Sequence, residues 1–429
     1  MPHILRSAVG ASVLGLGLVA CNLDVTNPSV IDASKFNPAA DGQTLALSAQ
    51  SNFFLAFQDV TVFGGFISDE LWTAAIRLQE NKIAGRTFLG SDDINIDFFQ
   101  PMSIAAVSNI SAASVLQTGS SASTDLNLAM VQMNAAYTLE IMAETMCTSV
   151  INGGPELTDA QLLDSAITRF SAAVTIATAA GANGTAILNE SNIGLARAYL
   201  QAGQYTNAAA TAALVPASFT AYVVTSANAS TLTTLGNQVW LNQQLGQIIV
   251  PALYRHLNDA RVGVDSTTCA TSNPALPCVI QTKYTGYGSP IRLASSLEAQ
   301  FIAAEAQLHG SSSTGPALAL IASERAAGGQ PPYSGGTDTT SVLEELINQR
   351  AREFWIEGKK LGDLRRNPTI AQTTVLTDSA GSPFYGVGSA TFGSNFCTPI
   401  PPEEIAANPH LSGSTSASVR RARSSSRGR

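Results

Sequence analysis

Helical periodicity between residues 158 and 216 constrains the fold of this chain more than any other feature. Thr158 and Gln161 have the form of a capping box, in which side chains and backbone at a helix start satisfy each other. After them, apolar residues recur at spacings of three and four, which places them on one helical face. A second helix is expected from about residue 186, and an alanine-rich third helix ends at Pro216. The region is therefore predicted to consist of amphipathic helices that each bury one face.

The turn between the second and third helices has the character of a helical repeat. Gly203 follows the second helix, a tyrosine comes two residues later, and small residues fill the next helix, which resembles the tetratricopeptide pattern. Similar alanine-rich segments lie at 126–146 and 295–308. Because such units bury their apolar faces by stacking, we predict a mainly α fold. Its tetratricopeptide-like helix pairs are expected at about 125–216 and 295–366, without a strict period.

Two long stretches of a different kind interrupt the helices. Residues from about 220 to 290 combine β-branched, Gly, Pro and Tyr residues, and residues from about 370 to 400 are rich in Gly, Ser and aromatic residues. Loops of this length in a folded protein are usually functional or contain short strands of their own. We therefore expect a loop-rich region with a few short strands, and we expect ligand contacts there.

The N-terminus has the form of a lipoprotein signal sequence. Residues 1–6 are basic, residues 8–20 are apolar, and small residues precede Cys21. We expect a signal peptide at 1–20 and lipidation of Cys21; the alternative is an ordinary signal peptide with a chance cysteine. The apolar stretch is about a dozen residues long, whereas a membrane-spanning helix needs about 20. The mature chain is thus expected to be held at the membrane by acyl chains.

Four cysteines remain after Cys21, an even number in a compartment where disulfides form. Cys269 and Cys278 bracket a turn-rich loop that a local disulfide would close, and this is the pairing that we predict. A second pairing, of Cys147 with Cys397, stays open. The four histidines are scattered and the sequence has no metal-binding Cys or His spacing, so no metal site is expected.

The charge content limits the choice of ligands. Only 13% of the residues are charged, so Ser, Thr, Asn and Gln supply much of the polar surface, which suits neutral ligands such as glycans better than phosphates. The net charge of −8 argues against a nucleic-acid partner. The exception is the tail at 412–429, where five arginines lie among serines without apolar periodicity. This basic tail is predicted to be disordered.

The most distinctive segment comprises residues 341–366. Ser341 and Glu344 have capping-box form, and apolar residues follow at helical spacing. Two arginines and two glutamates are three, four or seven residues apart, so ion pairs along the helix are expected. These four residues are Arg350, Arg352, Glu353 and Glu357. Gly358 is expected to end or kink the helix before a second, short helix.

Residues Ile347–Arg366, INQRAREFWIEGKKLGDLRR, closely resemble the C-terminal hallmark of the SusD/RagB family. Other segments occur in the order in which that family has them. They are the mature start at 23–28, an acidic turn at 68–70, repeat helices at 195–200 and 297–306, and an ending at 399–409. The resemblance extends over nearly the whole expected mature chain. The basic tail after Leu411 departs from it.

The resemblance implies a SusD-like domain at 21–411, in which tetratricopeptide-like helix pairs pack beside a loop-rich ligand-binding half. It also implies a partner, a TonB-dependent SusC-like outer-membrane transporter over which the surface-exposed lipoprotein sits like a lid. The implied function is the capture of an extracellular nutrient, most of all a glycan or oligosaccharide, without a cofactor. The class of nutrient does not carry over from the family, because binding positions vary within it.

Ligand sites of the family use aromatic platforms, because the apolar C–H faces of sugar rings pack on aromatic rings while polar side chains bond the hydroxyls. The expected ligand contacts are Trp72, Arg77 and Asn81 after the acidic turn, and Tyr284 and Tyr287 in a Gly-rich loop. For Trp72 the alternative is a core residue, and for the two tyrosines it is an anchor of the loop. Trp240 and Trp355 have apolar helical surroundings and are predicted to be core residues.

Catalysis is not expected from the sequence. A glycosidase needs two suitably spaced carboxylates, but Asp69 and Glu70 are chain neighbours, and Glu353 and Glu357 have arginines nearby to pair with. The sequence contains no nucleophile elbow, P-loop or dinucleotide-binding fingerprint. A lipid-anchored scaffold that holds another envelope protein through its helical repeats is the alternative to nutrient capture.

Overall fold

Helices make up most of the chain in the computed structural model, which describes residues 37–75, 77–92, 95–267, 271–371, 376–383 and 390–411. The long helices are α1 (Pro38–Asp59), α4 (Gln100–Leu116), α5 (Leu126–Thr145), α6 (Asp159–Ala179), α7 (Thr185–Gln201), α8 (Tyr205–Ala212), α11 (Ser296–Ser311), α12 (Gly315–Ala327) and α13 (Thr339–Glu353). The predicted mainly α fold is confirmed.

Short elements connect these helices. The short helices are α2 (Gly65–Ile67), α3 (Leu78–Ala84), α9 (Leu232–Leu235), α10 (Gln238–Gln244), α14 (Lys360–Arg366), α15 (Pro368–Ala371) and α16 (Pro402–Ala407). Three antiparallel strand pairs are β1 (Trp72–Thr73) with β3 (Ile248–Ile249), β2 (Thr220–Val223) with β6 (Ile291–Ser295), and β4 (Val264–Asp265) with β5 (Ile280–Gln281). Five of these six strands lie between residues 220 and 295, so the loop-rich region is built around short strands, as expected.

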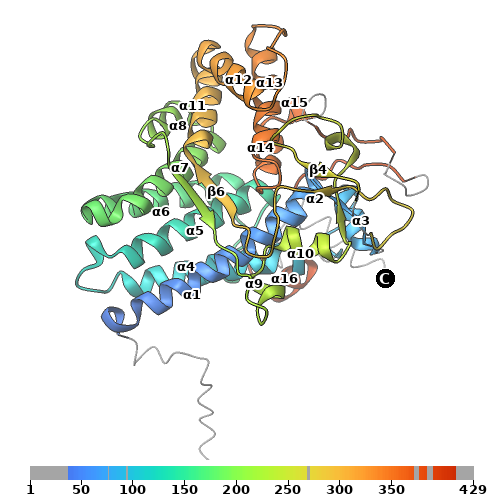
Figure 1. Cartoon of the computed structure of the whole chain (residues 1–429). Coiled ribbons are helices and arrows are strands. Elements are labelled where there is room, and N and C mark those ends of the chain that lie inside the picture. Colours follow the sequence, from blue (N-terminus) through green and yellow to red (C-terminus); the bar gives the residue numbers. More distant parts are fainter. Residues whose placement is uncertain are drawn as a thin grey trace, which may run out of the picture. The chain divides into compact units, whose positions relative to one another are not determined.

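The helices predicted from periodicity form where the sequence places them. Helix α6 begins with the expected capping box, in which the Gln161 N–H donates to Thr158 Oγ1 and the Thr158 N–H donates to Gln161 Oε1. Helices α7 and α8 follow on either side of Gly203, whose φ of 71° suits a residue without a Cβ. Figure 1 shows α6, α5, α4 and α1 packed in that order, and α7 packs against both α6 and α5.

A glycine lets three of these helices meet closely. A Cβ at Gly194 of α7 would lie 2.3 Å from Phe170 Cζ on α6 and 2.8 Å from Tyr137 Cζ on α5. The two rings meet edge to face with centroids 4.8 Å apart, an arrangement that aromatic quadrupoles favour. A small residue at this position is therefore required by the packing of the repeat.

The centre of the helical stack holds a buried ion cluster. The Arg197 side chain on α7 is 2% exposed, and its Nε donates to Glu144 Oε1 of α5 at 2.9 Å while a second nitrogen bonds the other Glu144 oxygen. Glu140 and Glu298 approach the same guanidinium at 3.7 and 3.8 Å. Burial raises the pKa of Glu140 well above its usual value, despite the nearby arginine. This cluster joins α5, α7 and α11 through charges that water does not reach.

The hallmark segment departs from the predicted details at both ends of its helix. The N-cap of α13 is Asp338, whose Oδ1 accepts from the Ser341 N–H, so the expected capping box at Ser341 is wrong. The helix ends at Glu353, and the backbone turns through left-handed φ values at Ile356 (57°) and Gly358 (68°) before α14 begins. Gly358 lies in the turn between the two helices, but the first helix ends at Glu353, five residues before the predicted position.

The ion pairs expected along this helix run between elements instead. Glu353 and Glu357 both bond Arg292 of β6, at 2.9 Å each, and Glu357 also accepts from Lys283 Nζ at 2.7 Å. Arg350 Nε bonds Asp363 Oδ2 of α14 at 2.8 Å. Because the helix stops at Glu353, Glu357 leaves the helical face on which i, i+4 partners meet. The charged residues of the hallmark segment therefore form ion pairs with β6 and α14, which are separate elements of the fold.

A disulfide joins Cys147, just after α5, to Cys397, 250 residues later. This is the pairing that the sequence left open. Cys278 is also disulfide-bonded, whereas its predicted partner Cys269 lies outside the described residues, as do Cys21 and the tail at 412–429. Within the described part of the chain, no helix is both long and apolar enough to span a membrane.

Candidate functional site

Trp72, the first expected ligand contact, is a core residue. Its side chain is fully buried, its backbone pairs with Ile249 across β1 and β3, and its ring meets that of Phe392 at a centroid distance of 5.5 Å. An indole buried in this way presents no face to a ligand, so the expected platform role is corrected. Both residues of β1 are buried, so this short strand lies within the core and has no side that faces solvent.

The two tyrosines of the Gly-rich loop differ from each other. Tyr284 is buried, and its hydroxyl donates to the Ile356 carbonyl at 2.7 Å, which makes it an anchor for the hallmark turn. Burial raises the pKa of this hydroxyl well above its usual value, so it stays a hydrogen-bond donor. Tyr287 is half-buried and packs close to Gly236, immediately before α10. Of the two, Tyr287 alone keeps ring surface toward solvent.

Arg77 and Asn81 lie one turn apart at the start of α3. The Arg77 side chain is 66% exposed and pairs with Glu80 at 2.9 Å. Asn81 Nδ2 donates to the Arg77 carbonyl at 2.8 Å and to the Ala75 carbonyl at 3.3 Å, so its amide already stabilises the local turn. The structure brings these two residues together, but their polar groups are engaged within the element that carries them.

Of the two tryptophans predicted to be core residues, Trp355 is fully buried and Trp240 is half-buried. The Trp355 ring stacks on Tyr254 at 5.4 Å, and its Nε1 donates to the Glu70 carbonyl at 3.1 Å. Glu70 Oε1 in turn accepts from the Ile356 N–H at 2.9 Å. The acidic turn and the hallmark, which both resemble family signatures, thus bond each other and serve the frame of the molecule.

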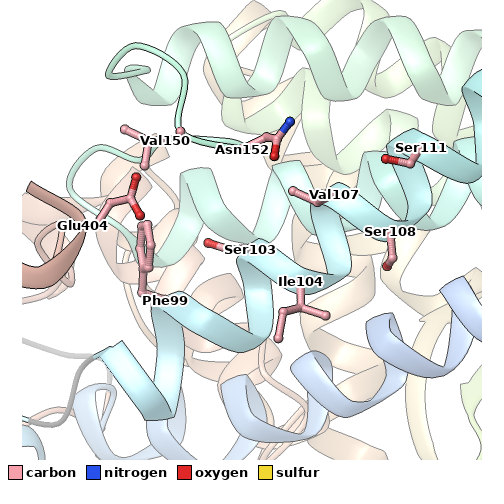
Figure 2. Close-up of a pocket in the computed structure, with 10 residues that line it drawn as sticks. Phe99, Ser103, Ile104, Val107, Ser108, Ser111, Val150, Asn152 and Glu404 are labelled. Atoms are coloured by element: carbon pink, nitrogen blue, oxygen red, sulfur yellow. The ribbon is translucent and has the colours of Figure 1, made fainter. Parts of the chain in front are cut away.

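A cavity of about 400 Å³ opens between α4, the loop after α5 and α16, and we call it the α4–α16 pocket. Its lining combines aliphatic side chains, hydroxyls, one amide and one carboxylate. The lining residues are Phe99, Ser103, Ile104, Val107, Ser108, Ser111, Val150, Asn152, Gly153 and Glu404. Figure 2 shows the serines on α4 below Asn152, with Glu404 approaching beside Phe99. The buried Ser103 hydroxyl has no hydrogen-bond partner within the described residues.

A second cavity of about 360 Å³ lies between α1, α4, α9 and α10, and we call it the α1–α4 pocket. Three amides, two threonine hydroxyls and one carboxyl group line it together with apolar surface. The lining residues are Asn52, Leu55, Asp59, Gln100, Pro101, Ile104, Thr233, Thr234 and Gln238. Gln238 Nε2 donates to the Gly236 carbonyl at 3.1 Å, which brings this wall next to Tyr287.

Ile104 belongs to both pockets. It stands on α4, is 48% exposed, and in Figure 2 points away from Ser103 and toward α1. The two pockets therefore adjoin along α4 and form one extended surface, which we call the α4 surface. Each volume falls within the range of about 300–1,000 Å³ typical of ligand pockets. Hydroxyl, amide and carboxylate groups around aliphatic patches match the alternating polar and apolar faces of a sugar ring.

Asp59 is the one ionisable residue in the lining of the α1–α4 pocket. Burial raises the pKa of its carboxyl to about 7, and no charged neighbour contributes to this shift. The carboxyl makes no hydrogen bond or ion pair with the described residues, and it does not cap the helical turn that follows it. Desolvation without compensation disfavours the charged form of an acid.

Replacing Asp59 by asparagine is expected to stabilise the protein above neutral pH. Because the folded pKa of about 7 exceeds the ordinary value of 3.8, the folded state holds the proton more tightly, and stability falls as pH rises from about 4 to 7. Asp59→Asn should therefore raise the free energy of unfolding by about 1–3 kcal/mol at pH 8 and change it little at pH 4. Urea denaturation at both pH values measures the difference. Asp164→Asn, at an exposed position, is the control. Equal effects of the two substitutions would show that burial does not raise the pKa of Asp59.

Sequence reasoning missed the α4 surface because its residues do not share one motif. Asp59 had a detectable signal, since it is the one charged residue in a long apolar run from Phe53 to Ile67. The contributions of α9 and α16 come from segments more than 110 residues away from α4. Among the described residues, no group of three or more His, Cys, Asp or Glu side chains is arranged to hold a metal ion.

Comparison with known proteins places this fold in a family. Residues 290–414 match the model of the SusD family. A SusD superfamily protein from Parabacteroides distasonis superposes with a TM-score of 0.67 at 12% identity, covering 88% of this chain and 98% of the other. A comparison with curated protein sequences finds no match.

Two further solved structures are similar over the same extent. A SusD-like carbohydrate binding protein from Bacteroides vulgatus has a TM-score of 0.66 at 13% identity, covering 88% of this chain and 98% of the other. Surface glycan-binding protein A from Bacteroides uniformis has a TM-score of 0.63 at 14% identity, with 86% and 98% covered. The mainly helical frame is that of SusD-like structures, and the C-terminal part of the chain, residues 290–414, carries the match to the SusD family that the hallmark suggested.

Proposed function

We propose that this protein is an outer-membrane lipoprotein that captures an extracellular glycan or oligosaccharide on the α4 surface and delivers it to a TonB-dependent SusC-like transporter. The observation that carries the proposal is the pair of adjoining pockets on either side of Ile104. Their amides and hydroxyls suit sugar hydroxyls, and their aliphatic walls suit the C–H faces of the rings. An extended surface of this kind favours a chain of several sugar units over a single one.

The family context supports the same proposal. Two of the similar structures are described as a carbohydrate binding protein and a surface glycan-binding protein. The lipobox cysteine Cys21 supplies the expected membrane anchor, and anchoring by acyl chains needs no spanning helix. The SusC-like partner and the transfer of ligand to it follow from the family resemblance.

We infer that the protein binds its ligand without chemical change. A glycosidase places two carboxyl groups about 5–9.5 Å apart across the scissile bond. Each pocket is lined by a single carboxyl group, Asp59 in one and Glu404 in the other. The carboxylates considered from the sequence hold the frame instead: Glu353 and Glu357 bond Arg292, and Asp69 bonds Arg86 at 2.5 Å.

Substitution of Ile104 tests the binding surface. Ile104→Ala removes apolar contact from both pockets and should weaken the binding of a neutral oligosaccharide about fivefold to tenfold, since about 1 kcal/mol of apolar contact is lost. Isothermal titration with a panel of starch, xylan, mannan and cellulose oligosaccharides identifies the ligand and measures the loss. Val115→Ala is the matched control, because Val115 is an exposed aliphatic residue of the same helix that lines neither pocket.

The alternative, a scaffold for another envelope protein, makes the opposite prediction. If no glycan or peptide of the panel bound, and if no outer-membrane barrel were recovered with the lipidated protein from detergent-solubilised membranes, the scaffold function would replace the one proposed. Labelled fatty acid that entered the wild-type chain but not Cys21→Ser would establish the anchor separately from ligand binding.

A further inference from the structure

The ionisable groups that line the α4 surface are all acidic. Its two pockets are lined by the carboxyl groups of Asp59 and Glu404, and neither lining contains a lysine, arginine or histidine. Fields from one sign of charge attract ligands of the opposite sign and repel those of the same sign. This lining therefore disfavours uronate or sulfated glycans, which carry negative charge.

The two carboxyl groups are not equivalent. Glu404 Oε1 accepts a hydrogen bond from Asn408 Nδ2 at 3.0 Å, so the protein itself compensates part of its charge. Asp59, which is half-buried at the end of α1, has no such partner within the described residues. Of all the polar groups around the α1–α4 pocket, Asp59 is thus the one whose ionised form requires a cation that the described chain does not supply.

The neighbours of Asp59 complete a site for a polar ring. Asn52 lies two helical turns before it on α1, and Gln100 faces the pocket from the first turn of α4. The Gln238 amide comes from α10, the element that carries the opposite wall. Asn52 and Gln100 can donate to and accept from hydroxyls, and Gln238 can accept through its Oε1, because its Nε2 already donates to the Thr233 and Gly236 carbonyls. None of the three amides can neutralise a carboxylate.

We propose that the α1–α4 pocket takes an amino sugar in its protonated form, with the ammonium group paired to Asp59 and the ring hydroxyls bonded by the surrounding amides. The proposal rests on carbohydrate binding by the α4 surface and names the class of sugar. An ammonium group offers three hydrogen-bond donors to the Asp59 carboxylate. Its positive charge also offsets the free-energy cost of desolvating a carboxylate that has no charged partner. The N-acetylated form of the same sugar has no charge at that nitrogen and lacks this interaction.

Oligosaccharides that differ only at this nitrogen test the proposal. At pH 7, wild-type protein should bind a tetramer of glucosamine at least about tenfold more tightly than a tetramer of N-acetylglucosamine, and tetragalacturonate most weakly. Asp59→Asn, which conserves the shape of the side chain, should abolish the preference for the amino form. Asp164→Asn, which removes an exposed carboxylate that lines neither pocket, should leave that preference in place.

Proton release gives a readout that a general loss of folding would not produce. Because burial raises the pKa of Asp59 to about 7, part of the free protein carries the proton at neutral pH, and pairing with an ammonium group should expel it. No other titratable side chain of the described chain lines this pocket. Titration in two buffers of different ionisation enthalpy should show proton release on binding to wild-type protein and none on binding to Asp59→Asn.

The possible outcomes separate this inference from the function on which it rests. Equal binding of the amino and N-acetylated tetramers, or tightest binding of tetragalacturonate, would overturn the amino-sugar assignment and leave carbohydrate binding intact. A preference that persisted in Asp59→Asn would overturn the role of Asp59. Binding of none of the three tetramers, nor of any neutral oligosaccharide, would overturn both.

Discussion

Replacement of Arg197 by leucine is expected to lower the free energy of unfolding by about 3–5 kcal/mol. Its guanidinium is the cation that Glu140, Glu144 and Glu298 share, and all four side chains are almost completely inaccessible to water. Removing it leaves buried carboxylates with their desolvation cost and without their main attraction. Urea denaturation monitored by circular dichroism measures the loss.

Two comparisons make this prediction specific. Arg77→Leu removes an exposed arginine from an i, i+3 pair with Glu80 and should change stability by less than about 1 kcal/mol. The double variant Arg197→Leu with Glu144→Leu should recover part of the loss, because it removes a buried charge together with its partner. If Arg197→Leu destabilised no more than Arg77→Leu, the buried cluster would not be holding α5, α7 and α11 together.

Truncation of Trp72 to alanine should cost about 3–5 kcal/mol, the range for removing a large aromatic residue from a packed core. The ring is fully buried against Phe392, so the substitution opens a cavity between β1 and the C-terminal part of the chain. Thermal and urea denaturation report the change. An effect below about 1 kcal/mol would place the indole at the surface, contrary to the structure.

The conservative variant Trp72→Phe separates a core role from a ligand platform. It keeps most of the apolar volume, so it should fold, and its affinity for the oligosaccharide identified in the panel should stay within about twofold of wild type. The α4 surface does not include Trp72, which is the reason for expecting unchanged binding. If the Trp72→Phe protein folded but no longer bound the ligand, Trp72 would be a ligand contact and not only a core residue.

The helical frame was predictable because its periodicity is strong. Residues 158–216 carry one apolar face per helix, and Thr158 with Gln161 fixes where α6 begins. The hallmark was recognised as a pattern, but its partners were not, since Arg292 lies 61 residues before Glu353. Pairing over such a distance is set by the tertiary fold and leaves no local signal.

The candidate site was not predictable, because helix α4 contradicts simple hydrophobic patterning. Its polar Asn109 is fully buried and donates to the carbonyls of Ala49 and Ala105, at 2.9 Å each, whereas Ile104 is 48% exposed. The two hydrogen bonds that Asn109 Nδ2 donates offset part of the cost of burying this amide, and a binding surface keeps apolar groups outward. Trp72 misled the prediction for the converse reason, since an aromatic residue after a polar turn suits a core as well as a platform.

Titration of the wild-type protein with neutral oligosaccharides of increasing length tests carbohydrate capture by the α4 surface most directly. Affinity should rise from monosaccharide to hexasaccharide as the ligand comes to occupy both pockets, and Ile104→Ala should reduce the gain at the longer lengths. Identical affinity at every length, unaffected by Ile104→Ala, or no binding at any length, would show that these adjoining pockets do not hold a glycan chain.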